Sequence, residues 1–149
     1  MRRWIAAGFG TGFVPRRLWG GTQGGGTLAA LLVSAAGIAL WDAPVLAGVA
    51  LASSATAASL WAAAPWAIDG DDPAWITIDE VAGTAVAMIG LAGWPWLAAV
   101  LVARLADIFK VLPGVRQAEM VPGPVGIVAD DLVAGGYGLV VGWAVKLLS

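Results

Sequence analysis

The stretch VAGTAVAMIGLAGWPWLAAVLVA, residues 81–103, contains no charged side chain. As one straight helix it would cross the ~30 Å hydrocarbon core of a bilayer. Its centre is interrupted by Gly93-Trp94-Pro95-Trp96, and the residue before a proline avoids the helical conformation. We therefore predict two helices, residues 80–92 and 96–109, joined by a turn. The first is only roughly 20 Å long, so it forms a half-deep hairpin arm rather than a full span.

Two further apolar tracts flank this hairpin. Asp42 is the only charge in residues 28–68, and residues 132–145 carry none. Because Trp41-Asp42-Ala43-Pro44 is a turn signal, the first tract splits into helices at 27–41 and 44–64. The second tract predicts a helix at 130–148. Residues 1–149 are thus expected to form one all-α domain, a polytopic integral membrane bundle of about five helices with short helical hairpins.

Composition supports a membrane protein. The 149 residues are 60% hydrophobic and 12% charged, whereas soluble domains average about 45–50% and about 25%. Residues 5–13 are broken by glycine and form no firm apolar core, so we reject a cleaved signal peptide.

The hairpin places most basic residues on one side of the membrane, with Lys146 on the other. By the positive-inside rule that side is cytoplasmic. A straight span would instead separate Asp79 from Asp130. The basic residues on the shared side are Arg2, Arg3, Arg16, Arg17, Arg104, Lys110 and Arg116.

The residue types that the chain lacks limit the catalytic chemistry that it could perform. The chain has no Cys and no His, which excludes thiolate nucleophiles, Ser-His-Asp triads, His-based phosphotransfer and the usual zinc sites. A net charge of −2 disfavours nucleic acid as a partner. Catalysis must therefore use carboxylates, Lys, Arg, hydroxyls, backbone amides or hard metal ions.

Acidic residues gather at the predicted helix ends on the cytoplasmic side. Two adjacent pairs, Asp79-Glu80 and Asp130-Asp131, begin helices, and Asp107 lies between Arg104 and Lys110 at spacings of three. Carboxylates that repel one another at a membrane boundary are stabilised by a divalent cation, and oxygen-only ligands suit Mg²⁺, Mn²⁺ or Ca²⁺.

Helix capping is the competing interpretation of the pairs. Thr77-x-x-Glu80 has the form of a capping box, and Asp130 that of an N-cap. Capping explains one acid per helix, so in each pair we expect one acid to cap and the other to bind metal. Three further acids resemble a solvated turn: Asp69, Asp71 and Asp72. The Arg104, Asp107 and Lys110 set is either a phosphate clamp or an ion pair at the membrane boundary.

A glycine-rich stretch, residues 18–27, leads into the first long helix. Amides exposed beside a helix N-terminus bind anions, which makes this stretch a candidate anion site. The same glycines also permit close helix packing, and the residues leave both interpretations open.

Four motifs in this order resemble the phosphatidylglycerophosphatase A family. They are GFGTGFVP (8–15) with GTQG (21–24), DEVAG (79–83), RLADIFK (104–110) and GIVADDLVAG (126–135). The acidic motifs are intact. The chain departs from the family pattern at Gly20, Gly25, Val111 and Pro124.

The resemblance implies a Mg²⁺-dependent lipid phosphatase that converts phosphatidylglycerophosphate to phosphatidylglycerol and inorganic phosphate in phospholipid biosynthesis. We expect the cation to be held by Asp79, Glu80, Asp130 and Asp131, with Asp107 as a further ligand or base. Arg104 and Lys110 would bind the phosphate, helped by Gly21, Thr22 and Gly24. Attack by an activated water and attack by an Asp both stay open.

Two alternatives accompany this hypothesis. The first is a non-enzymatic membrane protein, such as a transporter subunit or scaffold, with a carboxylate-lined cation site. The second is headgroup transfer, which ranks last because Asp69-Gly70 continues as Asp71-Asp72-Pro73 and lacks the Asp-Gly-x-x-Ala-Arg signature of that family. Oligomeric state is left open.

Overall fold

The computed structural model describes residues 1–21, 23–67 and 73–149. Within these ranges the chain is entirely helical, with eight α-helices, two 3₁₀ helices and no strand. The elements are α1 (Arg2–Ala6), η1 (Gly8–Phe13), α2 (Val14–Trp19), α3 (Gly25–Gly37), η2 (Ile38–Leu40), α4 (Val45–Ala63), α5 (Ile78–Ala87), α6 (Gly93–Phe109), α7 (Val115–Glu119) and α8 (Pro124–Leu148).

The predicted hairpin of residues 80–109 is confirmed. α5 and α6 run in opposite directions and are joined at 88–92, where Gly90 has a φ of 68°. The break lies earlier than predicted, because α6 begins at Gly93 rather than at Trp96. Pro95 falls in the first turn of α6, where a missing N–H costs no helical hydrogen bond. α5 is correspondingly short, at about 15 Å.

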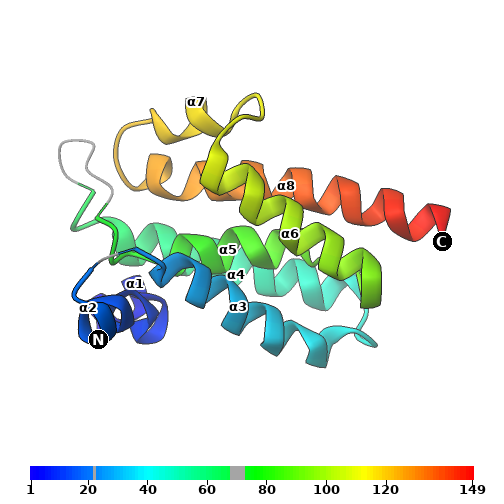
Figure 1. The fold of residues 1–149 in the computed structure, drawn as a ribbon, viewed down its shortest axis with the longest axis horizontal. Coiled ribbons are helices and arrows are strands. Elements are labelled where there is room, and N and C mark those ends of the chain that lie inside the picture. Colours follow the sequence, from blue (N-terminus) through cyan, green and yellow to red (C-terminus); the bar gives the residue numbers. More distant parts are fainter. Residues whose placement is uncertain (22, 68–72) are drawn as a thin grey trace.

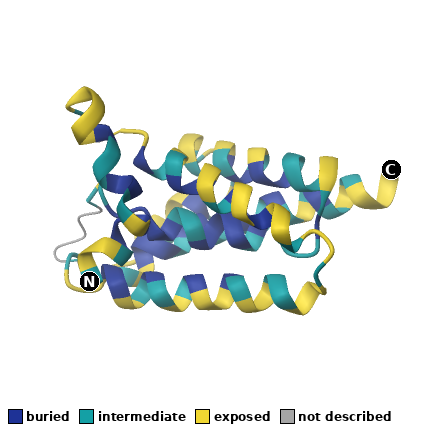
Figure 2. Cartoon of the chain, turned by 90° about the horizontal axis from the view of Figure 1, so that it is seen from below, coloured by how far each residue is buried: buried dark blue, intermediate teal, exposed yellow. Residues whose placement is uncertain are grey.

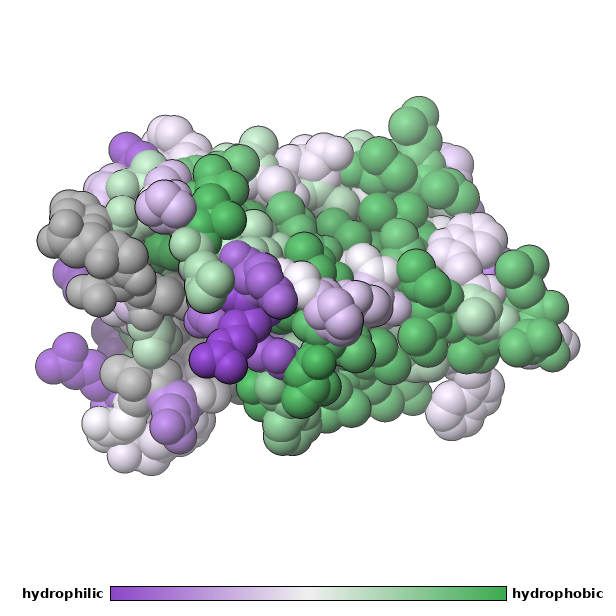
Figure 3. All heavy atoms as spheres, turned by 90° about the horizontal axis from the view of Figure 1, so that it is seen from above, coloured by the Kyte–Doolittle hydropathy of each residue, from purple (hydrophilic) through white to green (hydrophobic). Residues whose placement is uncertain are grey.

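Five helices run along the long axis of the molecule: α3, α4, α5, α6 and α8 (Figure 1). The starts of α3, α5 and α8 and the ends of α4 and α6 lie at the end of the molecule that also carries α1, α2 and α7. On the face shown in Figure 3, hydrophilic residues gather at that end, and hydrophobic residues dominate the other. The predicted gathering of acidic helix ends is therefore confirmed.

The predicted helix boundaries were wrong in two places that concern the site. α8 begins at Pro124, not at Asp130, because proline is favoured in the first turn of a helix. Asp130 is consequently inside the helix and is not its N-cap. At α5 the N-cap is Thr77, but its side chain makes no capping hydrogen bond, so the predicted capping box with Glu80 does not form. The short helices α1, α2 and α7 were not predicted.

The core is built from small residues on α5, α6 and α8, which are buried where these helices meet (Figure 2). A Cβ built on Gly138 would collide with the Ala99 carbonyl oxygen, and one on Gly142 would collide with the Leu91 side chain. Small residues thus let these backbones approach closely. By length and composition, α4 and α8 are the described helices that suffice to cross a membrane.

Candidate active site

The polar end of the bundle contains an open hollow with an empty volume of about 740 Å³. Its walls come from the loop before α3, the first turns of α3 and α5, the end of α6 and the second turn of α8. All five predicted acids line it, together with both predicted cations. The lining residues are Gln23, Gly24, Gly25, Gly26, Thr27, Ala74, Ile76, Asp79, Glu80, Arg104, Asp107, Ile108, Lys110, Asp130 and Asp131.

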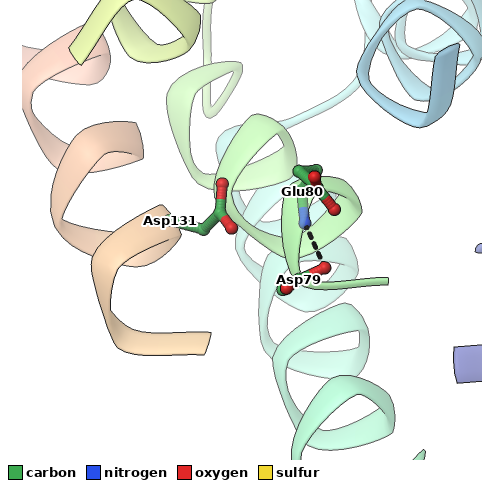
Figure 4. A group of neighbouring side chains, drawn as sticks. All are labelled: Asp79, Glu80 and Asp131. Atoms are coloured by element: carbon green, nitrogen blue, oxygen red, sulfur yellow. Dashed lines mark hydrogen bonds between the residues drawn. The ribbon is translucent and has the colours of Figure 1, made fainter. Parts of the chain in front are cut away.

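Asp79, Glu80 and Asp131 form a carboxylate triad. One oxygen from each lies within 4.8 Å of the others, with Asp79 and Glu80 on α5 and Asp131 on the neighbouring α8 (Figure 4). Asp79 and Asp131 are buried, and the Glu80 backbone N–H donates to Asp79 Oδ1 at 3.1 Å. Glu80 Oε2 is buried and has no hydrogen-bond partner among the described residues. Three carboxylates are therefore brought together, and one of them has an unsatisfied oxygen.

Glycines hold the triad together. A Cβ built on Gly83 would lie 2.5 Å from the Asp131 carbonyl oxygen, and one on Gly135 would collide with the Gly83 carbonyl. α5 and α8 therefore touch backbone to backbone at the depth of the triad. From the other side, a Cβ on Gly26 of α3 would collide with the Glu80 carboxylate. The glycines of the DEVAG and GIVADDLVAG motifs thus position the acids beside them.

The other two acids are held by cations. Arg104 Nη1 donates to Asp107 Oδ2 at 2.8 Å and lies 3.9 Å from Asp131 Oδ1. Lys110 Nζ donates to Asp130 Oδ2 at 2.8 Å and pairs with Glu119 Oε1 on α7 at 2.6 Å. The predicted spacing therefore yields ion pairs that border the triad. Arg104 connects the ion pairs to the triad, because its guanidinium lies close to both Asp107 and Asp131.

Burial sets the electrostatics of the hollow. Loss of hydration raises the pKa of Glu80 to about 8, although its hydrogen bond with Asp79 acts in the opposite direction. Burial alone would lower the pKa of Lys110, but its hydrogen bonds to Asp130 and Glu119 raise that pKa above the ordinary value. Lys110 stays charged, whereas Glu80 is costly to ionise until a cation compensates it.

The glycine-rich stretch contributes only in part. Gly24 is the N-cap of α3, with a φ of 97°, and residues 23–27 line the hollow opposite the acids. Gly21 is not among the lining residues, and Thr22 lies outside the described residues, as do Asp69, Asp71 and Asp72. Gly24 therefore lies at the hollow and Gly21 does not, and anion binding by this stretch stays a prediction.

The N-terminal segment fixes the start of α5. Thr77 N donates to the Ala6 carbonyl at 2.9 Å, and Thr77 Oγ1 shares a hydrogen bond of 2.8 Å with Thr11 Oγ1. A Cβ on Gly12 would collide with the Trp75 carbonyl oxygen. Sequence reasoning missed this contact, together with the contact between Gly26 and Glu80. Gly12 was the available sequence signal for this contact. Its packing role can be recognised only when the residue that it touches, Trp75, is known.

These features define a helical protein in which a cluster of carboxylates lies beside two cations held by ion pairs, a combination suited to phosphate chemistry. The chain belongs to the phosphatidylglycerophosphatase A family, whose family model matches residues 4–146. A Bacteroides thetaiotaomicron protein, named as a candidate phosphatidylinositol-3-phosphatase, is 34% identical over 147 residues, covering 91% of this chain and 87% of the relative. No solved structure matches the chain. The family and this relative support a lipid phosphatase.

Proposed function

We propose that the chain hydrolyses phosphatidylglycerophosphate to phosphatidylglycerol and inorganic phosphate with the assistance of Mg²⁺. The observation that carries this proposal is the triad of Asp79, Glu80 and Asp131, with the buried, unpartnered Glu80 Oε2 beside the Arg104 and Lys110 cations. The family assignment supplies the substrate.

The residues present fit a hard divalent cation. Their donors are carboxylate oxygens, which Mg²⁺ prefers, and Glu80 is left with an unsatisfied buried oxygen that a cation would satisfy. Asp79, Glu80 and Asp131 would hold the ion, with Asp107 and Asp130 at the border of the site. When bound, Mg²⁺ supplies Lewis-acid polarisation of a phosphoryl oxygen.

The chain's own groups position the phosphate. Arg104 and Lys110 are held by carboxylates at the rim of the hollow, with N–H donors left over for phosphate oxygens. Hydrolysis adds a water oxygen to phosphorus and breaks the bond to the glycerol oxygen, which leaves with a proton. Asp107 is the candidate to accept the proton of the water. Direct attack by an Asp of the triad is the competing route.

The substrate is a membrane lipid in this proposal. α4 and α8 would cross the bilayer, and the outer faces of α3, α4, α6 and α8 expose large apolar side chains, among them Leu31, Leu46, Leu101 and Val140. The short α5–α6 hairpin leaves the acids near the polar end. A lipid headgroup would enter there on the cytoplasmic side of the bacterial inner membrane while its acyl chains stay in the bilayer.

A second substrate has one specific observation in its favour. The Bacteroides thetaiotaomicron relative is named for the 3-phosphate of phosphatidylinositol. Both lipids carry a terminal phosphomonoester, so the same site chemistry applies to each.

The test is phosphate release by the purified protein from each lipid in mixed micelles, with Mg²⁺ and then with EDTA. We expect Mg²⁺-dependent release from phosphatidylglycerophosphate, faster than from phosphatidylinositol 3-phosphate. The reverse preference would overturn the substrate but keep the reaction. Folded protein that binds Mg²⁺ calorimetrically but releases phosphate from neither lipid would overturn the reaction and favour the non-enzymatic cation site.

A further inference from the structure

A second polar hollow lies on the N-terminal helices, outside the candidate active site. It has an empty volume of about 840 Å³ and is lined from both α1 and α2 by Arg3, Trp4, Phe13, Arg16 and Arg17. It shares no lining residue with the candidate active site. Figure 1 shows α1 and α2 together at the polar end, beside the long helices.

The charge of this hollow is positive, because three of its five lining residues are arginines. The chain contains no acidic residue before Asp42. The Arg3 guanidinium lies over the rings of Phe13 and Trp75, at 5.5 and 5.3 Å from their centres. Arg16 and Arg17 are exposed, and neither forms an ion pair with the residues that the structure describes. An anionic ligand would complement these two guanidinium groups.

The same segment exposes large apolar side chains. Trp4, Phe9, Leu18 and Trp19 are each more than half exposed, at 57%, 73%, 71% and 57%. Arginine beside exposed Trp, Phe and Leu is typical of a segment that lies in the headgroup region of a membrane. The positive charge of the arginines favours an anionic ligand, and the exposed apolar side chains favour a lipid. The two observations together favour an anionic phospholipid.

We propose that the hollow of α1 and α2 binds the phosphate of an anionic phospholipid headgroup, with Arg16 and Arg17 pairing with the phosphate oxygens. Trp4 and Phe13 supply the apolar walls. The bound lipid seats the N-terminal helices at the membrane surface. This proposal does not depend on hydrolysis at the candidate active site.

The test measures lipid binding by the full chain in neutral maltoside micelles. Energy transfer from the protein's tryptophans to dansyl-labelled phosphatidylglycerol, or to dansyl-labelled phosphatidylcholine, reports the apparent affinity. Two double variants remove the same charge: Arg16→Gln with Arg17→Gln, and Arg116→Gln with Lys146→Gln as the control outside the hollow. No tryptophan changes in either variant. Circular dichroism checks helix content.

We expect phosphatidylglycerol to bind about 25-fold more weakly to the Arg16 and Arg17 variant, at about fivefold per Arg. The control variant binds as the wild type does, and added salt narrows the difference. Arg16→Lys with Arg17→Lys retains most of the affinity. Equal losses in the two Gln variants would overturn the proposal, as would equally tight binding of phosphatidylcholine by the wild type.

Discussion

The carboxylate triad and the ion pairs beside it use the same residue types but differ in what satisfies them. Asp107 and Asp130 each accept a hydrogen bond of 2.8 Å from a cation, and Lys110 is shared with Glu119. The triad joins three carboxylates, and Asp131 lies 3.9 Å from Arg104 Nη1. Glu80 Oε2 has no hydrogen-bond partner in the part of the chain that the structure describes. In the ion pairs both carboxylates are satisfied, and the atom left without a partner among the described residues is a donor, Arg104 Nε, which suits a phosphate oxygen. An unsatisfied carboxylate oxygen instead requires a cation or a proton. The ion pairs therefore form the border of the site, and the carboxylate triad is where a ligand is expected.

The largest effect is expected from Asp131→Asn, which removes one triad oxygen as a charged ligand. Loss of several kcal/mol of cation stabilisation predicts a decrease in kcat/KM on the order of 1000-fold. Phosphate release from phosphatidylglycerophosphate measures it. Asp42→Asn, exposed in the loop at the opposite end of the bundle, is the matched control and keeps wild-type activity. Near-normal activity of Asp131→Asn would remove the triad from the mechanism.

Asp130→Asn tests the border. It replaces the charged partner of Lys110 and leaves the triad intact. Activity should fall by about 10–100-fold, as for groups that position ligands or phosphate-binding cations without touching the metal. A loss as large as that of Asp131→Asn would show that Asp130 is itself a ligand, as the sequence suggested.

Mg²⁺ should stabilise the protein through the triad alone. At a concentration of about 100 Kd, a bound ion raises the free energy of unfolding by about 2.7 kcal/mol. The melting temperature should rise with Mg²⁺ in the wild type and in Asp130→Asn, and return with EDTA. Asp131→Asn should show no such rise. A Mg²⁺ response that survives in Asp131→Asn would place the ion elsewhere.

The smallest effect is expected at Gly26, which contacts Glu80 without contributing a ligand. The Cβ of Gly26→Ala collides with the Glu80 carboxylate and must displace it, at a cost of about 1–3 kcal/mol in stability. Chemical denaturation measures the change. Gly136→Ala, on α8 with no atom within 4 Å of the new Cβ, is the control and should gain up to about 1 kcal/mol. Equal stability of the two variants would contradict the contact.

The sequence predicted the parts of this comparison that depend on local signals. Pro95 in an uncharged tract predicted the hairpin, and the hairpin brought Asp79 and Asp131 to the same end of the bundle. The division of the five acids into two groups was not predictable. It follows from the α5–α8 contact at Gly83 and Gly135, which joins residues far apart in the chain.

The predictions of the α8 start and of the α5 cap were wrong where two sequence signals competed. Asp130 has the form of an N-cap, but Pro124 starts the helix six residues earlier and places Asp130 inside it. Thr77 has the form of a capping residue, but its hydroxyl is engaged by Thr11. In both cases a distant or earlier partner decided the outcome, and no short window of sequence contains it.

The order of the helices along the chain has a consequence for biosynthesis. Asp79 and Glu80 belong to α5, but Asp131 belongs to α8, which is synthesised after both α5 and α6. The α5–α6 hairpin therefore exists before its partner, with Gly83 uncovered and two acids unaccompanied by the third. The carboxylate triad forms only when α8 docks, so a nascent chain halted after α6 has two of its acids and lacks the third. In the proposed function, ion binding at the triad would therefore report completed assembly.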